Sequence, residues 1–238
     1  MFKIEREYYY LLKKIRDKIP FSIAHFNDGE MDYIINNRKR PISYGDQDYS
    51  KLLRDELEKA FLTNNKLYYR GLPCKLCHAQ LYTSGKSLLN NNHTIYTEIS
   101  ACVFHHNYHN KLKFLKLLQN YNIVWIANKD FNLKKLCNII NIDIKKSRLI
   151  YVPKKNAFDS LNILKNEKFE PTELVILLCG PLGRILSCLY FEKFQKTTFL
   201  CLGSYFDNLV YNKIHKYYCL NGVNHRYCKE CFPFNPNS

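Results

Sequence analysis

Short apolar runs alternate along this chain with longer stretches in which apolar residues recur at helical spacing. Residues 123–126 and 174–178 are wholly apolar, which is typical of strands that are covered on both faces. The pattern therefore predicts an α/β fold: a single doubly wound, mostly parallel sheet of Rossmann type, with helices on both faces. Strands are expected at 21–26, 66–70, 122–127, 148–152, 173–179 and 198–202, and helices at 5–18, 50–62, 107–120, 132–141, 157–166, 182–193 and 206–218.

The size and composition of the chain are those of one globular domain. It has 238 residues, of which 46% are hydrophobic and 15% aromatic, enough to form a sizeable core. It contains no internal repeat and no low-complexity linker. We therefore expect one domain over residues 1–238, with a cysteine-containing tail at about 219–238.

The chain is strongly basic, with a formal net charge of +15 and a sequence pI of about 9.3. Such a charge suits polyanionic partners, namely nucleic acid, a phospholipid surface or phosphate-bearing substrates. The lysines are dispersed and accompany no nucleic-acid recognition motif, which favours a general attraction to anions. The first residues are too charged for a signal peptide, and no segment has the roughly 20 apolar residues of a membrane span. With ten cysteines, the chain is expected in a reducing, cytoplasmic compartment.

Residues suited to phosphate binding follow the predicted strands. In open α/β sheets, ligands bind at the carboxyl ends of the strands. Glycines there let a phosphate approach helix N–H groups, and lysines add positive charge. Turn chemistry alone would also place glycine, proline and asparagine in such loops, but their occurrence after several strands favours a site. The candidates are Lys129, Lys155, Asn156, Gly180, Pro181, Gly203 and Ser204.

The segment Asp28-Gly29-Glu30 follows the first predicted strand and allows two interpretations. Two carboxylates around one glycine form a site for a hard divalent cation such as Mn²⁺ or Mg²⁺, if the glycine lets the backbone turn so that both acids face one ion. Alternatively, the acids cap a helix, where they stabilise its first N–H groups and its dipole. The spacing alone does not choose between the two.

Two C-x2-C pairs, Cys74 with Cys77 and Cys228 with Cys231, have the spacing of a structural zinc site. Because they lie far apart in sequence, the fold would have to bring them together. Unrelated thiols and a redox dithiol are the alternatives. Cys219, His78 and His225 are possible substitute ligands, while Cys102, Cys137, Cys179 and Cys188 stand in apolar runs and are expected to be small core residues.

Four segments resemble motifs of the GT-D type glycosyltransferases, a family once known as a domain of unknown function. Residues 25–31 (HFNDGEM) resemble its R-F-G-D-G-E segment, which carries a D-x-E motif, and residues 152–158 (VPKKNAF) resemble its P-x-x-N-A-F segment. Residues 178–186 (LCGPLGRIL) are similar to its G-P-T-A-x-x-L turn, and residues 200–204 (LCLGS) to the end of a later strand. The order and spacing agree from about residue 20 to 215.

The resemblance implies an enzyme that moves a sugar from a nucleotide-sugar donor to a glycan or other hydroxyl acceptor, as in polysaccharide biosynthesis. The expected donor is a UDP-sugar. The resemblance also implies that Asp28 and Glu30 hold Mn²⁺ or Mg²⁺ against the donor diphosphate, beside the loop residues named above. The chain departs from the family pattern at His25, Asn27, Leu182-Gly183 and Cys201. For an inverting reaction, the candidate bases are His105, His106 and Asp207.

Two other functions compete with this one. A basic, zinc-stapled protein could bind nucleic acid through dispersed lysines and exposed tyrosines. A metal-dependent phosphohydrolase could use the same acid pair, although such enzymes usually place more carboxylates or histidines around the metal than this sequence offers.

Overall fold

The computed structural model describes residues 3–37, 47–73, 75, 78–91, 96–97, 108–203 and 205–210. Within these ranges, all the strands are parallel and form one seven-stranded sheet, in the order β3-β2-β1-β7-β6-β4-β5. This confirms the predicted parallel α/β sheet. The strands are β1 (Ser22–His25), β2 (Tyr68–Gly71), β3 (Tyr96–Thr97), β4 (Asn122–Asn128), β5 (Ser147–Val152), β6 (Glu173–Leu178) and β7 (Thr198–Cys201).

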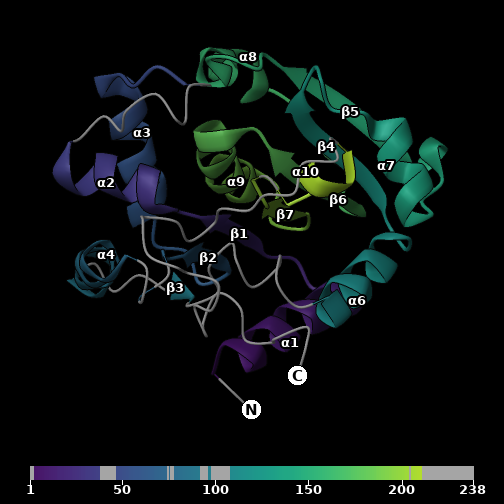
Figure 1. The fold of residues 1–238 in the computed structure, drawn as a ribbon, viewed down its shortest axis with the longest axis horizontal. Helices are drawn as coiled ribbons and strands as arrows, with labels where there is room; N and C mark the ends of the chain where they lie inside the picture. Colours follow the sequence, from purple (N-terminus) through teal and green to yellow (C-terminus); the bar gives the residue numbers. More distant parts are fainter. Residues whose placement is uncertain are drawn as a thin grey trace.

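Helices cover both faces of the sheet, as predicted (Figure 1). The core on one face includes side chains of α2 (Asp28–Asn36), α3 (Lys51–Leu62), α4 (Ala79–Asn91), α8 (Leu161–Leu164) and α9 (Gly180–Lys193). The core on the other face includes side chains of α1 (Lys3–Arg16), α6 (Tyr108–Leu118), α7 (Leu133–Ile140) and α10 (Asp207–Val210). None of the described helices is long and apolar enough to cross a membrane.

The alternation of side chains along β4 explains how a nearly continuous apolar strand feeds both cores. Val124 and Ile126 belong to the core with α9, whereas Ile123, Trp125 and Ala127 belong to the core with α7. Successive residues of a strand point to opposite faces. A strand with helices on both sides therefore needs apolar residues at every position, which is the pattern seen in the sequence.

Several helices differ from their predicted extents. Helix α9 begins at Gly180 rather than at 182, because Pro181 fits the first turn of a helix, where its missing N–H has no partner to lose. The helix expected at 157–166 is a short 3-10 helix, Ala157–Ser160, followed by α8. A further 3-10 turn, Ile144–Lys146, precedes β5. The helix expected at 206–218 is described only as far as Val210.

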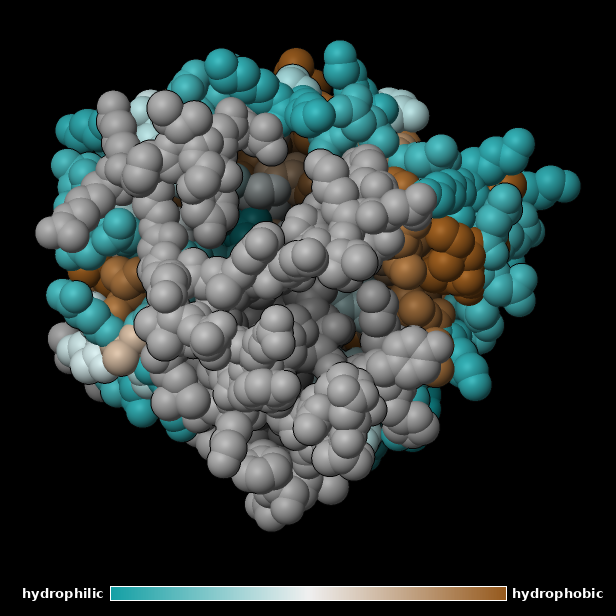
Figure 2. All heavy atoms as spheres, viewed as in Figure 1, coloured by the Kyte–Doolittle hydropathy of each residue, from teal (hydrophilic) through white to brown (hydrophobic). Residues whose placement is uncertain are grey.

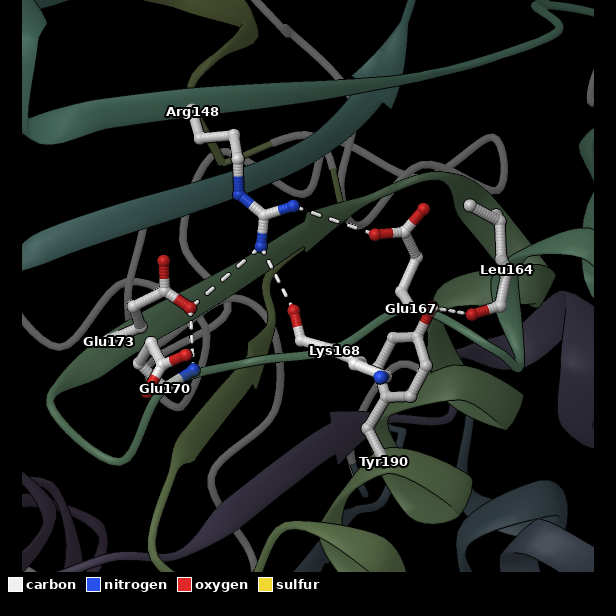
Figure 3. Close-up of polar contacts among 7 residues, drawn as sticks. All are labelled: Arg148, Leu164, Glu167, Lys168, Glu170, Glu173 and Tyr190. Atoms are coloured by element: carbon white, nitrogen blue, oxygen red, sulfur yellow. Dashed lines mark hydrogen bonds and ion pairs between the residues drawn. The ribbon is translucent and has the colours of Figure 1, made fainter.

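At the amino edge of the sheet, one arginine joins the starts of two strands (Figure 3). Arg148 lies near the start of β5, and its guanidinium is 3.5 Å from a carboxylate oxygen of Glu167 and 3.8 Å from one of Glu173, the first residue of β6. It also donates to the carbonyl of Lys168 at 3.1 Å. Since ligands of parallel α/β sheets bind at the opposite edge, we interpret this network as structural.

Candidate functional site

The acid pair and those predicted phosphate-binding residues that the structure describes follow strands at the carboxyl edge of the sheet. Strand β1 lies between β2 and β7, and β6 follows β7. Because these strands are parallel, the segments that follow His25, Leu178 and Cys201 leave the sheet along one edge. The start of α2, the start of α9 and the turn at Gly203 therefore come together in the middle of the sheet.

Helix α2 begins directly after β1, and its first turn contains both acids. Asn27 is its N-cap residue, and the backbone N–H of Asn27 donates to Oε2 of Glu30 at 3.1 Å. Glu30 thus supplies the reciprocal half of a capping box. The capping interpretation therefore holds for Glu30, whereas Asp28 is the first helical residue and places a negative charge at the helix start.

The turn at Gly29 that the cation interpretation assumes is not present. Gly29 lies inside α2 and is not among the residues with a positive φ. Positions two apart in an α-helix are separated by about 200° around its axis, so their side chains do not face each other. Asp28 and Glu30 accordingly have different partners.

Glu30 pairs with a buried arginine. Its Oε1 lies 3.2 Å from Nε of Arg184, and the two side chains are only 10% and 5% exposed. The same Nε donates to the carbonyl of His25 at 2.8 Å, and Nη1 donates to the carbonyl of Gly180 at 2.5 Å. Arg184 therefore ties the end of β1, the first turn of α2 and the first turn of α9 together.

Asp28 faces the residue that precedes α4. Its Oδ2 lies 3.8 Å from Nε2 of His78, and the two side chains are 15% and 17% exposed. The carbonyl of His78 accepts a bond from the N–H of Tyr82, which fixes His78 at the start of α4. A carboxylate and an imidazole that both retain access to solvent are groups that can exchange protons with a ligand.

Two of the predicted glycines adopt a conformation that is uncommon for residues with a side chain. Gly180 and Gly203 both have φ of +57°, in the left-handed region where a side chain is strained. A Cβ on Gly203 would lie 3.7 Å from Nη2 of Arg184, whereas one on Gly180 would meet nothing within 4 Å. Both glycines, like Pro181, retain some exposure, so the backbone at the start of α9 is accessible from this edge.

The remaining described candidates lie after β4 and β5. Lys129 and Lys155 are exposed. Asn156, with φ of +55°, accepts from the N–H of Asp48 at 2.7 Å and donates to its Oδ2 at 2.9 Å. Asn156 therefore holds the segment before α3 against the end of β5. In Figure 2 the coloured surface around the grey atoms is mostly hydrophilic, with hydrophobic patches on the left and right.

Next to these lysines, Lys154 is 2.8 Å from Asp130, and this hydrogen bond lowers the pKa of Asp130. Lys154 is thus engaged by a neighbouring carboxylate, whereas Lys129 and Lys155 project from the edge as the sequence predicts.

The cysteines that the structure describes are core residues. Cys137, Cys179, Cys188 and Cys201 are buried free thiols, which confirms the expectation for the first three. Burial raises the pKa of Cys179 and of Cys201, so both thiols stay neutral and unreactive at neutral pH.

Several predicted residues lie outside the described part of the chain. These are Ser204, the bases His105 and His106, and the four cysteines Cys74, Cys77, Cys228 and Cys231, together with Cys102, Cys219 and His225. The zinc site stays a prediction. Asp207 is the first residue of α10.

The described residues do not fit a divalent ion shared by Asp28 and Glu30. Both oxygens of Glu30 already have partners, one of them a positively charged guanidinium. Nowhere in the described ranges do three or more histidine, cysteine or acidic side chains converge as metal ligands. Asp28, with His78 beside it, is the member of the pair that keeps a partly exposed carboxylate.

Two functional candidates escaped the sequence analysis. Arg184 stands in the apolar run Leu182-Gly183-Arg184-Ile185-Leu186, and an arginine within a buried helix face needs an acidic partner. That signal was present, but it did not identify Glu30. The sequence suggests His78 only as a zinc ligand, because nothing local in the sequence places it beside Asp28.

Comparison with known proteins gives a likeness of fold. Neither the protein-family models nor the curated protein sequences contain a match to the chain. A solved structure described as a new glycosyltransferase (DUF1792) from Streptococcus sanguinis superposes with a TM-score of 0.61 at 16% identity, covering 91% of this chain and 86% of the other. A second, described as domain of unknown function 1792 with a distinct glycosyltransferase fold, has a TM-score of 0.58 at 16% identity and covers 84% and 79%. The chain therefore has the fold of these proteins, and the resemblance seen in its motifs is confirmed at that level.

Proposed function

We propose that this protein is a glycosyltransferase that moves a sugar from a nucleotide-sugar donor to a hydroxyl acceptor at the carboxyl edge of its sheet. The observation that carries the proposal is the match over most of both chains to structures described as glycosyltransferases. Fold alone does not determine activity. The proposal therefore also draws on the residues that meet at this edge.

We place the donor diphosphate at the first turn of α9. The first N–H groups of a helix have no partner within it, and together with the positive end of the helix dipole they attract phosphate; a Cβ on Gly180 would meet nothing within 4 Å. Lys129 and Lys155, exposed at the ends of β4 and β5, add positive charge at the same edge. When the sugar–phosphate bond breaks, negative charge develops on the leaving diphosphate, and these groups would stabilise it.

Asp28 and His78 are the titratable pair best placed for the acceptor. A carboxylate beside an imidazole can orient it and support proton removal from an acceptor hydroxyl. Their separation of 3.8 Å is longer than a hydrogen bond, and such pairs often tighten only when substrate binds. We assign His78 the role of base and Asp28 that of its partner.

The dependence on Mn²⁺ or Mg²⁺ is proposed only through Asp28, since Glu30 is engaged by Arg184. A bound ion would supply charge neutralisation at the diphosphate. The UDP-sugar donor and the glycan acceptor are carried over from the motif resemblance.

The proposal is tested by screening nucleotide sugars with and without Mn²⁺, following both the melting temperature and nucleotide release. A true donor raises the melting temperature, because it binds only the folded state, and is hydrolysed slowly without acceptor. If no nucleotide sugar shifts the melting temperature or is turned over under any condition, the proposed function is wrong.

A further inference from the structure

We propose that Glu30 is a positioning residue whose partner is Arg184, and that it does not serve as a metal ligand. The acid pair then contributes one carboxylate, that of Asp28, to ligands at the carboxyl edge. The consequence for Asp28 rests on the proposed function, whereas the pairing itself is a property of the folded chain.

Both carboxylate oxygens of Glu30 contact groups of the protein itself. One carboxylate oxygen faces Nε of Arg184 at 3.2 Å, and the other accepts the N–H of Asn27 at 3.1 Å. Both partners belong to the protein and are fixed by helix starts. With 10% of its side chain exposed, Glu30 has little surface left for a ligand.

The electrostatics point the same way. A divalent cation that used Glu30 would share its carboxylate with a guanidinium that is 5% exposed. Two cations a few ångströms apart repel each other strongly where water is excluded. Moving Arg184 away would also strip the carbonyls of His25 and Gly180 of the donors that bond them.

The pair formed by Glu30 and Arg184 fixes the start of α2 relative to the start of α9. Arg184 lies one turn into α9, and through Glu30 it fixes the first turn of α2, which carries Asp28. Gly203 packs against the same guanidinium, since a Cβ there would lie 3.7 Å from Nη2. The pair thus sets the spacing between the start of α9, where the diphosphate is placed, and Asp28.

A double-mutant cycle tests the pairing. Glu30→Gln removes the carboxylate that faces the buried guanidinium, and Arg184→Met removes the guanidinium that faces the buried carboxylate. Each should lower the melting temperature by about 6–20 °C. The double variant, which buries neither charge, should melt above the lower-melting single variant, showing coupling. Losses that simply add would overturn the proposal.

Glu30→Asp keeps a carboxylate able to bind metal but shortens it by one methylene. A positioning role predicts a lower melting temperature with Mn²⁺ affinity, measured by calorimetry, unchanged from the wild type. A wild-type melting temperature in Glu30→Asp, or a tenfold or greater loss of Mn²⁺ affinity in the double variant, contradicts the proposal. If the wild type binds no Mn²⁺, Glu30 holds none.

Asp28→Asn is the matched control, since it changes the other acid of the same turn. It should leave the melting temperature near that of the wild type. These measurements do not depend on turnover. A protein that transfers no sugar would fail the proposed function while the cycle still reports on the pair.

Discussion

Oδ2 of Asp28 lies 3.8 Å from Nε2 of His78, and the two residues stand at the starts of α2 and α4. Glu30, in the same turn as Asp28, points instead to Arg184. The two acids of the motif therefore belong to different pairs: Asp28 to a partly exposed pair with His78, and Glu30 to a buried pair with Arg184. The two acids should respond differently to substitution.

Asp28→Asn should reduce turnover of a nucleotide sugar by about 100-fold or more, because it removes the charge beside His78, the proposed base, and general acid–base catalysis contributes about 10²–10⁴-fold in typical enzymes. The fold should be preserved, since the side chain keeps nearly the same size. Steady-state kinetics and a melting curve on the same preparation measure both effects. Turnover equal to that of the wild type would show that Asp28 has no part in the reaction.

Gly183→Ala should destabilise the protein by about 1–3 kcal/mol through overpacking. A Cβ there would lie 2.9 Å from Sγ of Cys201 and 3.4 Å from Sγ of Cys179. Gly29→Ala is the matched control. Its Cβ would approach only the hydroxyl of Tyr49, at 3.8 Å, and alanine is the better helix former by about 0.5–1 kcal/mol. Denaturant unfolding measures both variants, and equal stabilities would refute the packing around Gly183.

Arg148→Met should cost about 1 kcal/mol of stability and leave turnover unchanged. The arginine side chain is 45% exposed, so its ion pairs with Glu167 and Glu173 are weakened by solvent. Its contacts join strand starts at the amino edge, away from the candidate site (Figure 3). Urea unfolding and a turnover assay measure the two quantities. A large loss of turnover without a loss of stability would place this edge in the function.

Cys188 should make the protein less stable in alkali. Burial raises the pKa of its thiol to about 11, whereas an exposed cysteine in the unfolded chain titrates near 8.5. Above about pH 8.5 the unfolded state loses this proton while the folded state keeps it. The contribution of the Cys188 thiol to the free energy of unfolding is therefore fully present below about pH 8.5 and is lost as the pH rises to about 11. The loss is at most about 1.4 kcal/mol per pH unit.

The measurement is the free energy of unfolding between pH 8 and 11 for the wild type and for Cys188→Ala. The variant keeps every other titrating group, so its curve should fall less steeply. Parallel curves would mean that the thiol of Cys188 titrates normally in the folded protein.

The strands were predictable because burial on both faces leaves an apolar signature that can be read locally, as in β4 and β6. Strand β3, with two residues, is too short to leave one. Helix α4 (AQLYTSGKSLLNN) has polar residues and a glycine in its middle, so its periodicity is weak.

The site was harder to predict because its contacts are long-range. Asp28-Gly29-Glu30 can be interpreted as a cap or as a cation site, and only the position of Arg184 after β6 decides for Glu30. The placement of His78 beside Asp28 likewise depends on β1 and β2 being neighbours. By contrast, the positions of Lys129 and Lys155 directly after β4 and β5 could be read from the local sequence.

The most direct test of the account is release of nucleotide diphosphate from a panel of nucleotide sugars by the purified wild-type protein, compared with Asp28→Asn. We expect at least one donor to be turned over by the wild type and to raise its melting temperature, with turnover by the variant at least 100-fold lower. A wild-type protein that neither binds nor cleaves any donor, with or without Mn²⁺, would contradict the account.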